Sequence, residues 1–231
     1  MRGRAVALLT FAAVLAGCVS TTPNTPPAPT PVPLPAPARP AAGPPDAGAA
    51  YDALLDRARQ RPPDVDFGAL RMAYARSERY RPYSRYPDEE PPMKQALDAR
   101  DWRIVLEIAE SALARNYVRA RPHFWAMTAN GNLGRAAAAA HHRAVMEGLL
   151  RSIAASGDGR TPATAMVVID VQEEYDVMTF LGVTSRVQGL VHEAGRAFDR
   201  HDVEGRDGAR STVYFDVSLP LSRAPFGPPP R

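Results

Sequence analysis

The sequence predicts an α+β fold in which stacked helical hairpins come first and a small antiparallel β-sheet follows, within a single domain. Two observations carry this prediction. Between Ala49 and Ala155, apolar residues recur with a period near 3.6, which indicates helices. After Gly159 the period changes to about 2, and glycines separate the segments, as expected for strands joined by tight turns. About 170 residues are enough for one hydrophobic core.

The first two helices flank a pair of prolines. One helix begins at Ala49 and ends before Pro62, with an apolar face formed by Tyr51, Leu54, Leu55 and Ala58. Asp66 has the right chemistry to cap a second helix, because its carboxylate can accept a hydrogen bond from a free backbone amide. The inner face of that helix carries Phe67, Leu70, Tyr74 and Ser77.

Four more helical segments complete the first part. Residues 93–99 predict a short helix, and Asp101 is expected to cap the next one, whose buried face is formed by Trp102, Val105, Leu106, Ala109 and Leu113. Residues 122–153 predict two further helices, separated near Gly131 and Gly134. Short connections of this kind favour antiparallel neighbours, and therefore helical hairpins.

Two turns of the predicted helical layer lie at a regular spacing. Arg100-Asp101-Trp102 and Gly134-Arg135-Ala136 occupy corresponding turn positions 34 residues apart. This spacing is weakly similar to that of tetratricopeptide repeats. Asn130, however, stands where an aromatic residue is expected. A generic layer of helical hairpins is the alternative.

The second part predicts a sheet with one intervening helix. Residues 165–171 form a β-branched run typical of a buried strand, and residues 173–181 suit a short helix. Three strands are then expected over residues 187–192, 196–203 and 211–219, with turns at Gly195 and at the pair Gly205 and Gly208. The folded domain is therefore expected to span residues 49–220, with helices over 49–155 and the sheet over 163–219.

The amino terminus predicts a lipoprotein signal. Arg2 and Arg4 precede an apolar run that is too short to span a bilayer stably, and Leu15-Ala16-Gly17 then leads to Cys18, the only cysteine. The pattern resembles the bacterial lipobox, which implies that residues 1–17 are removed and that Cys18 carries acyl chains, such as palmitate. The alternative is ordinary cleavage near Gly17 that leaves an incidental thiol.

A tether is expected between the lipid and the domain. Residues 18–48 are rich in proline, alanine and threonine, and 11 of the 24 prolines lie between Pro23 and Pro45. Such a segment lacks the apolar content needed to fold. The tail, residues 221–231, is expected to be disordered as well. The chain is thus predicted to lie in the cell envelope, and Val19 after the cysteine favours the periplasmic face of the outer membrane.

Charge excludes one class of partner. The chain has 28 basic and 25 acidic residues, and two of the basic residues leave with the signal, so the mature protein is close to neutral. A nucleic-acid-binding protein would need a basic surface, so no nucleic acid is expected. The expected partners are the membrane, through the lipid, and an envelope protein.

Several landmarks resemble one known family. Asp66-Phe67, Tyr80 to Tyr83, Ser156-Gly157-Asp158-Gly159, Glu173-Glu174-Tyr175 and the segment Tyr214-Phe215-Asp216-Val217 occur in an order similar to that of the bacterial domain of unknown function 4919. The resemblance covers roughly residues 51–217. It implies an exported or envelope protein and assigns no activity.

The most distinctive segment is a turn followed by an acidic helix. Its candidate functional residues are Ser156, Gly157, Asp158, Gly159, Glu173, Glu174 and Tyr175. A hydrolase could use Asp158, Glu173 or Glu174, and a histidine, because acid–base catalysis needs such groups within hydrogen-bond reach. The structural alternative is that Asp158 and Gly157 form a helix cap and turn, while the two glutamates complement a helix dipole.

The leading functional hypothesis is a non-enzymatic binding or scaffold module. Tyr80, Arg81 and Tyr83 form its candidate interaction surface, since tyrosine and arginine are enriched at interfaces. A metal centre would need His123, together with His141 or His142, to meet a glutamate across a hairpin. Because such a centre needs several independent placements at once, the sequence predicts neither a metal nor another cofactor, and no catalytic residue is assigned.

Overall fold

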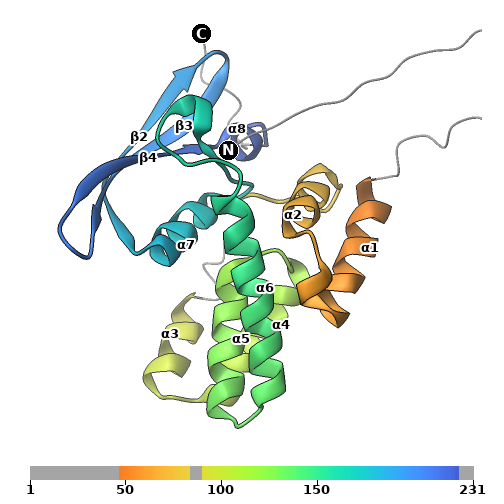
Figure 1. The fold of residues 1–231 in the computed structure, drawn as a ribbon. Coiled ribbons are helices and arrows are strands. Elements are labelled where there is room, and N and C mark those ends of the chain that lie inside the picture. The colour runs from red at the N-terminus through yellow and green to blue at the C-terminus, as the bar shows by residue number, and fades with distance from the viewer. Residues whose placement is uncertain (1–46, 84–89, 224–231) are drawn as a thin grey trace, which may run out of the picture. The chain divides into compact units, whose positions relative to one another are not determined.

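The computed structural model describes residues 47–83 and 90–223 (Figure 1). The predicted signal peptide, Cys18, the tether up to residue 46 and tail residues 224–231 lie outside the described residues. Within the described part, no helix combines the length and the apolarity needed to cross a membrane.

Six helices and a short 3₁₀ turn form the first part, as the sequence predicts. They are α1 (Ala47–Gln60), η1 (Pro62–Asp64), α2 (Phe67–Arg76), α3 (Glu90–Asp98), α4 (Trp102–Arg115), α5 (Ala120–Asn132) and α6 (Ala136–Ala154). Both predicted caps are present: Asp66 accepts a hydrogen bond of 2.8 Å from the Ala69 amide, and Asp101 accepts from the amides of Arg103 and Ile104. Helices α4, α5 and α6 pack side by side as hairpins (Figure 1).

The second part is a four-stranded sheet with two helices. Its elements are η2 (Pro162–Thr164), β1 (Met166–Val167), α7 (Val171–Leu181), β2 (Val183–Glu193), β3 (Arg196–Gly205), β4 (Arg210–Asp216) and α8 (Ser218–Leu221). The strand order is β1-β4-β3-β2. The predicted α+β class is confirmed, and the turns lie at Gly195 and between Gly205 and Gly208.

The sheet differs from the prediction in one respect, because it is mixed rather than antiparallel. β1 pairs with β4 in parallel, and the other pairs are antiparallel. The predicted strand over 165–171 shrinks to two residues because Asp170 leaves the sheet to cap α7, where its carboxylate accepts from the Gln172 amide. The last predicted strand ends at Asp216, since α8 begins at Ser218.

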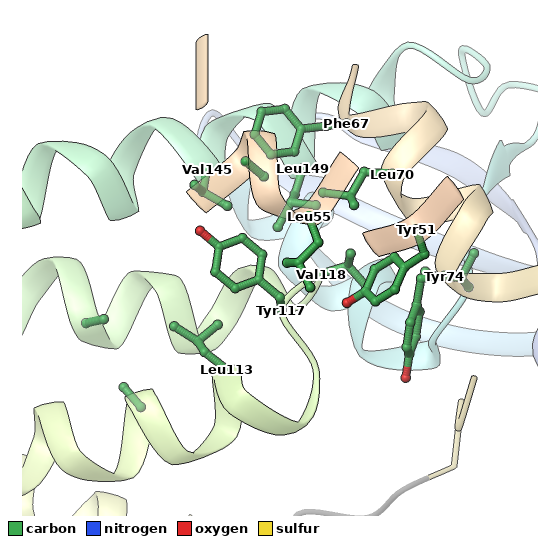
Figure 2. Close-up of a cluster of buried hydrophobic side chains, with 14 of the residues drawn as sticks. Tyr51, Leu55, Phe67, Leu70, Tyr74, Leu113, Tyr117, Val118, Val145 and Leu149 are labelled. Atoms are coloured by element: carbon green, nitrogen blue, oxygen red, sulfur yellow. The ribbon is translucent and has the colours of Figure 1, made fainter. Parts of the chain in front are cut away.

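Helix α6 contributes to both hydrophobic cores. Val145 and Leu149 belong to the core of the helical layer, which Figure 2 shows together with Tyr51, Phe67 and other side chains. Leu150 and Ile153 of the same helix belong to a second core with α7 and the sheet. One helix therefore joins the two layers.

Candidate functional site

Two adjacent glutamates near the start of α7 face different partners. Glu173 and Glu174 are 5% and 0% exposed, although a helix dipole alone would leave such residues at the surface. Glu173 binds Arg71 of α2 through two hydrogen bonds, Nε to Oε1 at 2.9 Å and Nη2 to Oε2 at 2.6 Å. Glu174 instead lies against His201 of β3. Successive residues on a helix point about 100° apart, which explains the divergence.

The Arg71–Glu173 pair lies at the junction of the two layers. Arg71 also donates to the Val167 carbonyl at 3.0 Å, and Glu173 Oε2 accepts from the Ile169 amide at 2.8 Å. The Tyr80 hydroxyl donates to the Ile169 carbonyl at 2.7 Å. Tyr80 is only 3% exposed, so it cannot contribute to the interaction surface predicted around it. In the structure, its hydrogen bond fixes the backbone of the segment that follows β1.

The Ser156–Gly159 segment is part of the same framework. Ser156 Oγ accepts from the Val167 amide at 2.8 Å, and the Gly159 carbonyl accepts from the Tyr214 amide of β4 at 2.8 Å. A side chain at Gly157 would lie 2.6 Å from the Ala165 carbonyl oxygen and closer still to that of Thr164, so only glycine fits. A glycine that ends a helix as its cap usually has a positive φ. In this turn Gly159 has that conformation, so Gly157 is required for the close approach of the backbone and not as a helix cap.

Asp158 is exposed, and its hydrogen bonds remain within its own turn. The carboxylate accepts from the Thr164 hydroxyl at 2.5 Å and from the Arg160 amide at 2.9 Å. These two hydrogen bonds lower the pKa of Asp158, the Thr164 bond contributing most. The partners of Asp158 are therefore distinct from those of Glu173 and Glu174.

The other buried polar cluster combines Glu174, Asp199 and His201. One candidate ligand atom from each residue lies within 4.8 Å of the others, and all three residues are buried. His201 Nε2 is 2.8 Å from Glu174 Oε2. Glu174 Oε1 has no hydrogen-bond partner in the described part of the chain. The cluster thus contains a carboxylate oxygen that is buried and unsatisfied.

Three further side chains orient this cluster. Ser185 Oγ is 2.8 Å from His201 Nδ1, and Gln188 Nε2 donates to Asp199 at 2.8 Å. The Tyr175 hydroxyl donates to Gln188 Oε1 at 2.6 Å, and both of these residues are exposed. Tyr175 and Gln188 therefore separate the cluster from solvent.

Burial dominates the electrostatics of the cluster. Loss of hydration raises the pKa of Glu174 to about 7, with a further upward effect from the Asp199 charge, while the hydrogen bond with His201 acts in the opposite direction. Tyr83 is 36% exposed, and burial followed by the Asp199 charge raises its pKa. Of the predicted site residues, Glu174, Tyr175 and Tyr83 are thus brought near Asp199.

A second histidine cluster lies inside the helical layer. His123 Nδ1 and His142 Nδ1 share a hydrogen bond of 3.0 Å, while His123 Nε2 donates to the Tyr117 carbonyl at 2.9 Å. His141 bonds the Tyr117 hydroxyl instead. Burial lowers the pKa of His123 to about 3 and that of His142 to about 4, so both are neutral at pH 7. The predicted meeting of histidines occurs, but the two α7 glutamates lie elsewhere.

An apolar groove of about 430 Å³ lies between α5, α6 and α7. Its lining residues are Ala120, Arg121, Phe124, Trp125, Met146, Leu150, Asp176, Thr179 and Phe180. Phe124 and Phe180 are 48% and 42% exposed, which is unusual for such large apolar side chains. The polar residues include the ion pair between Arg121 and Asp176, whose closest atoms are 2.8 Å apart. Sequence analysis did not single out this groove.

The remaining residues of the predicted interaction surface are more accessible. Arg81 is exposed, and its guanidinium donates to the carbonyl groups of Glu78 and Tyr80. The predicted set of Tyr80, Arg81 and Tyr83 therefore combines one core residue with two exposed ones.

Comparison with known proteins gives one match. No curated protein and no solved structure matches the chain. The family model described as "Domain of unknown function (DUF4919)" matches residues 47–224, which include all the helices and strands described above. The chain therefore belongs to the DUF4919 family.

Proposed function

We propose that the protein is a lipid-anchored protein of the bacterial cell envelope whose folded part binds a single-chain amphiphile in the groove between α5, α6 and α7. The groove is the observation that carries this proposal. Its volume and its apolar lining with few polar groups match those of small-molecule sites.

The chemistry of the groove indicates the kind of ligand. Phe124, Trp125 and Phe180 offer an apolar surface for a hydrocarbon chain, and burying one such side chain contributes about 1.5–3 kcal/mol. Arg121 lies at the same site with its side chain 36% exposed, so it can donate to the carboxylate of a fatty acid while keeping its contact with Asp176. A lipid anchor at Cys18 would hold this groove close to a source of amphiphiles.

The hydrolase hypothesis has less support. Asp158 is held by its own turn, Glu173 by Arg71, and Glu174 by His201. Acid–base catalysis needs its groups to share a reacting atom. These separate sets of partners favour a binding function over the predicted catalytic set.

The anchor is tested by replacing its attachment residue. Cys18→Ala is expected to abolish acyl labelling and to release the protein from membranes or leave it unprocessed, because the thiol is the site of acylation in this proposal. Fractionation of cells and labelling with a fatty-acid analogue measure both effects. A processed Cys18→Ala protein that stays on the membrane would contradict the anchor.

The groove is tested by fluorescence. The chain has two tryptophans, so Trp102→Phe leaves Trp125 in the groove as the only one. Dodecanoate is expected to change the Trp125 emission in a saturable way. Phe124→Ser or Phe180→Ser should weaken this binding about 10- to 100-fold, since each removes an apolar contact worth about 1.5–3 kcal/mol.

Leu190→Ser is the matched control, because Leu190 is 49% exposed on β2 and does not line the groove. It should leave dodecanoate binding unchanged. Equal weakening in the control and the groove variants, or a response that does not saturate, would rule out the groove as the binding site. Unchanged binding in all variants would do the same.

A further inference from the structure

We infer that Glu174, Asp199 and His201 form a binding site for a divalent transition-metal ion such as Zn²⁺, which joins α7 to β3. The donor set of one imidazole nitrogen and two carboxylate oxygens suits this class of ion. The inference does not depend on the groove, since none of the three residues lines it.

The first argument is charge. Glu174 and Asp199 are 0% and 8% exposed, and no arginine or lysine of residues 47–83 and 90–223 pairs with either carboxylate. A buried carboxylate needs a compensating positive charge or a proton. Glu174 Oε1 is also fully buried, and no group in the described ranges donates a hydrogen bond to it. A cation between the two carboxylates would satisfy both requirements at once.

The second argument is orientation. His201 and Asp199 are two residues apart on β3, so their side chains lie on the same face of the sheet, toward α7. Ser185 Oγ lies 2.8 Å from His201 Nδ1 and can accept a hydrogen bond from its N–H, which leaves the lone pair of Nε2 for an ion on the side that faces Glu174. Metal-binding histidines are usually fixed in this way at their second nitrogen. Gln188 holds Asp199 in the same manner.

The third argument is distance. Ligand atoms around tetrahedral zinc lie about 2.1 Å from the ion and therefore about 3.4 Å from each other. The three candidate atoms already lie within 4.8 Å of one another. Small rotations of side chains would complete the site, and an ion could reach it when the exposed pair Tyr175 and Gln188 separates.

The test uses the full-length chain after treatment with a chelator and its removal. Calorimetric titration with ZnCl₂ should give one ion per chain. At free Zn²⁺ one hundred times the Kd, the ratio of folded to unfolded protein should rise about 100-fold, and Tm should rise by about 5–10 °C. Co²⁺ should give visible absorption bands that are absent in His201→Gln.

Asp199→Asn, Glu174→Gln and His201→Gln should each lose the Zn²⁺ response. The first two remain able to fold, because the new amide can donate to the facing carboxylate. His192→Gln is the matched control, since His192 is exposed on β2, and His123→Gln tests the other histidine cluster. Both should keep the response.

Two results would overturn the inference. If His201→Gln responds to Zn²⁺ as the wild type does, the ion binds elsewhere. If Zn²⁺ leaves the wild type unchanged, the three residues do not bind the ion, and a higher Tm of Glu174→Gln at pH 8 would then show that the buried charge of Glu174 is uncompensated.

Discussion

Replacing Arg71 with methionine is expected to destabilise the folded protein by about 3–5 kcal/mol, because it leaves the carboxylate of Glu173 buried without a counter-charge. The side chains of Arg71 and Glu173 are 2% and 7% exposed, so water cannot take the place of the guanidinium. The Val167 carbonyl would lose its donor as well. Urea denaturation measures the loss: the midpoint concentration of urea should fall, while the m value stays unchanged.

Two variants complete this experiment. Lys94→Ala removes an exposed pair with Asp98, whose side chains are 76% and 66% exposed, and should change stability by less than about 0.5 kcal/mol. The double variant Arg71→Met with Glu173→Met removes both buried charges and should be more stable than Arg71→Met alone. If Arg71→Met behaves like Lys94→Ala, the pair does not hold the two layers together.

Acid is expected to destabilise the protein through His123. The folded-state pKa of His123 is about 3, below the unfolded value of about 6.5. Between these two pH values, the imidazole is therefore protonated in the unfolded chain and neutral in the folded protein. Stability contributed by the neutral imidazole is therefore present above pH 6.5 and is lost as pH falls toward 3. The slope approaches about 1.4 kcal/mol per pH unit, or about 3 kcal/mol between pH 6.5 and 4.

The measurement compares wild type with His123→Gln. Burial raises the pKa of Asp170 to about 6 and that of Glu174 to about 7, so these two groups lower the free energy of unfolding as pH rises. In the wild type they partly cancel the pH dependence that His123 causes. The difference between the two proteins removes their contribution. It should shrink by about 3 kcal/mol from pH 6.5 to 4.

The exposed His192 provides the control for this comparison. His192→Gln should give a curve parallel to that of the wild type over the whole pH range. A constant difference between wild type and His123→Gln would show that His123 titrates equally in the folded and unfolded states. That result would contradict its burial as a neutral group.

Local chemistry made much of the fold predictable. Asp66 and Asp101 cap helices because a short carboxylate next to free amides has few better partners, and Gly195 and Gly208 form turns because their φ angles are positive. The α+β class followed from the change in hydrophobic period. β1 was harder, since its two residues pair with a strand almost 50 positions later, which no local pattern indicates.

The candidate site was predictable only in part. Glu173 and Glu174 were singled out, but their partners were not, because Arg71 lies 102 residues before Glu173. Asp199 and His201 carried a signal that sequence analysis did not use: in a strand expected over 196–203, they occupy alternate positions and hence one face. Tyr80 was predicted at the surface because its aromatic and arginine neighbours resemble an interface. In the structure, its hydroxyl donates a hydrogen bond to a buried carbonyl.

The position of β4 sets the order in which the protein can fold. β4 lies between β1 and β3, although it is the last strand to be synthesised. A chain that emerges N-terminus first can assemble its helices early, but β1 has no partner and β3 keeps an open edge until residues 210–216 appear. Folding of the sheet is thus a late event, and a chain truncated before Arg210 would expose two strand edges that invite aggregation.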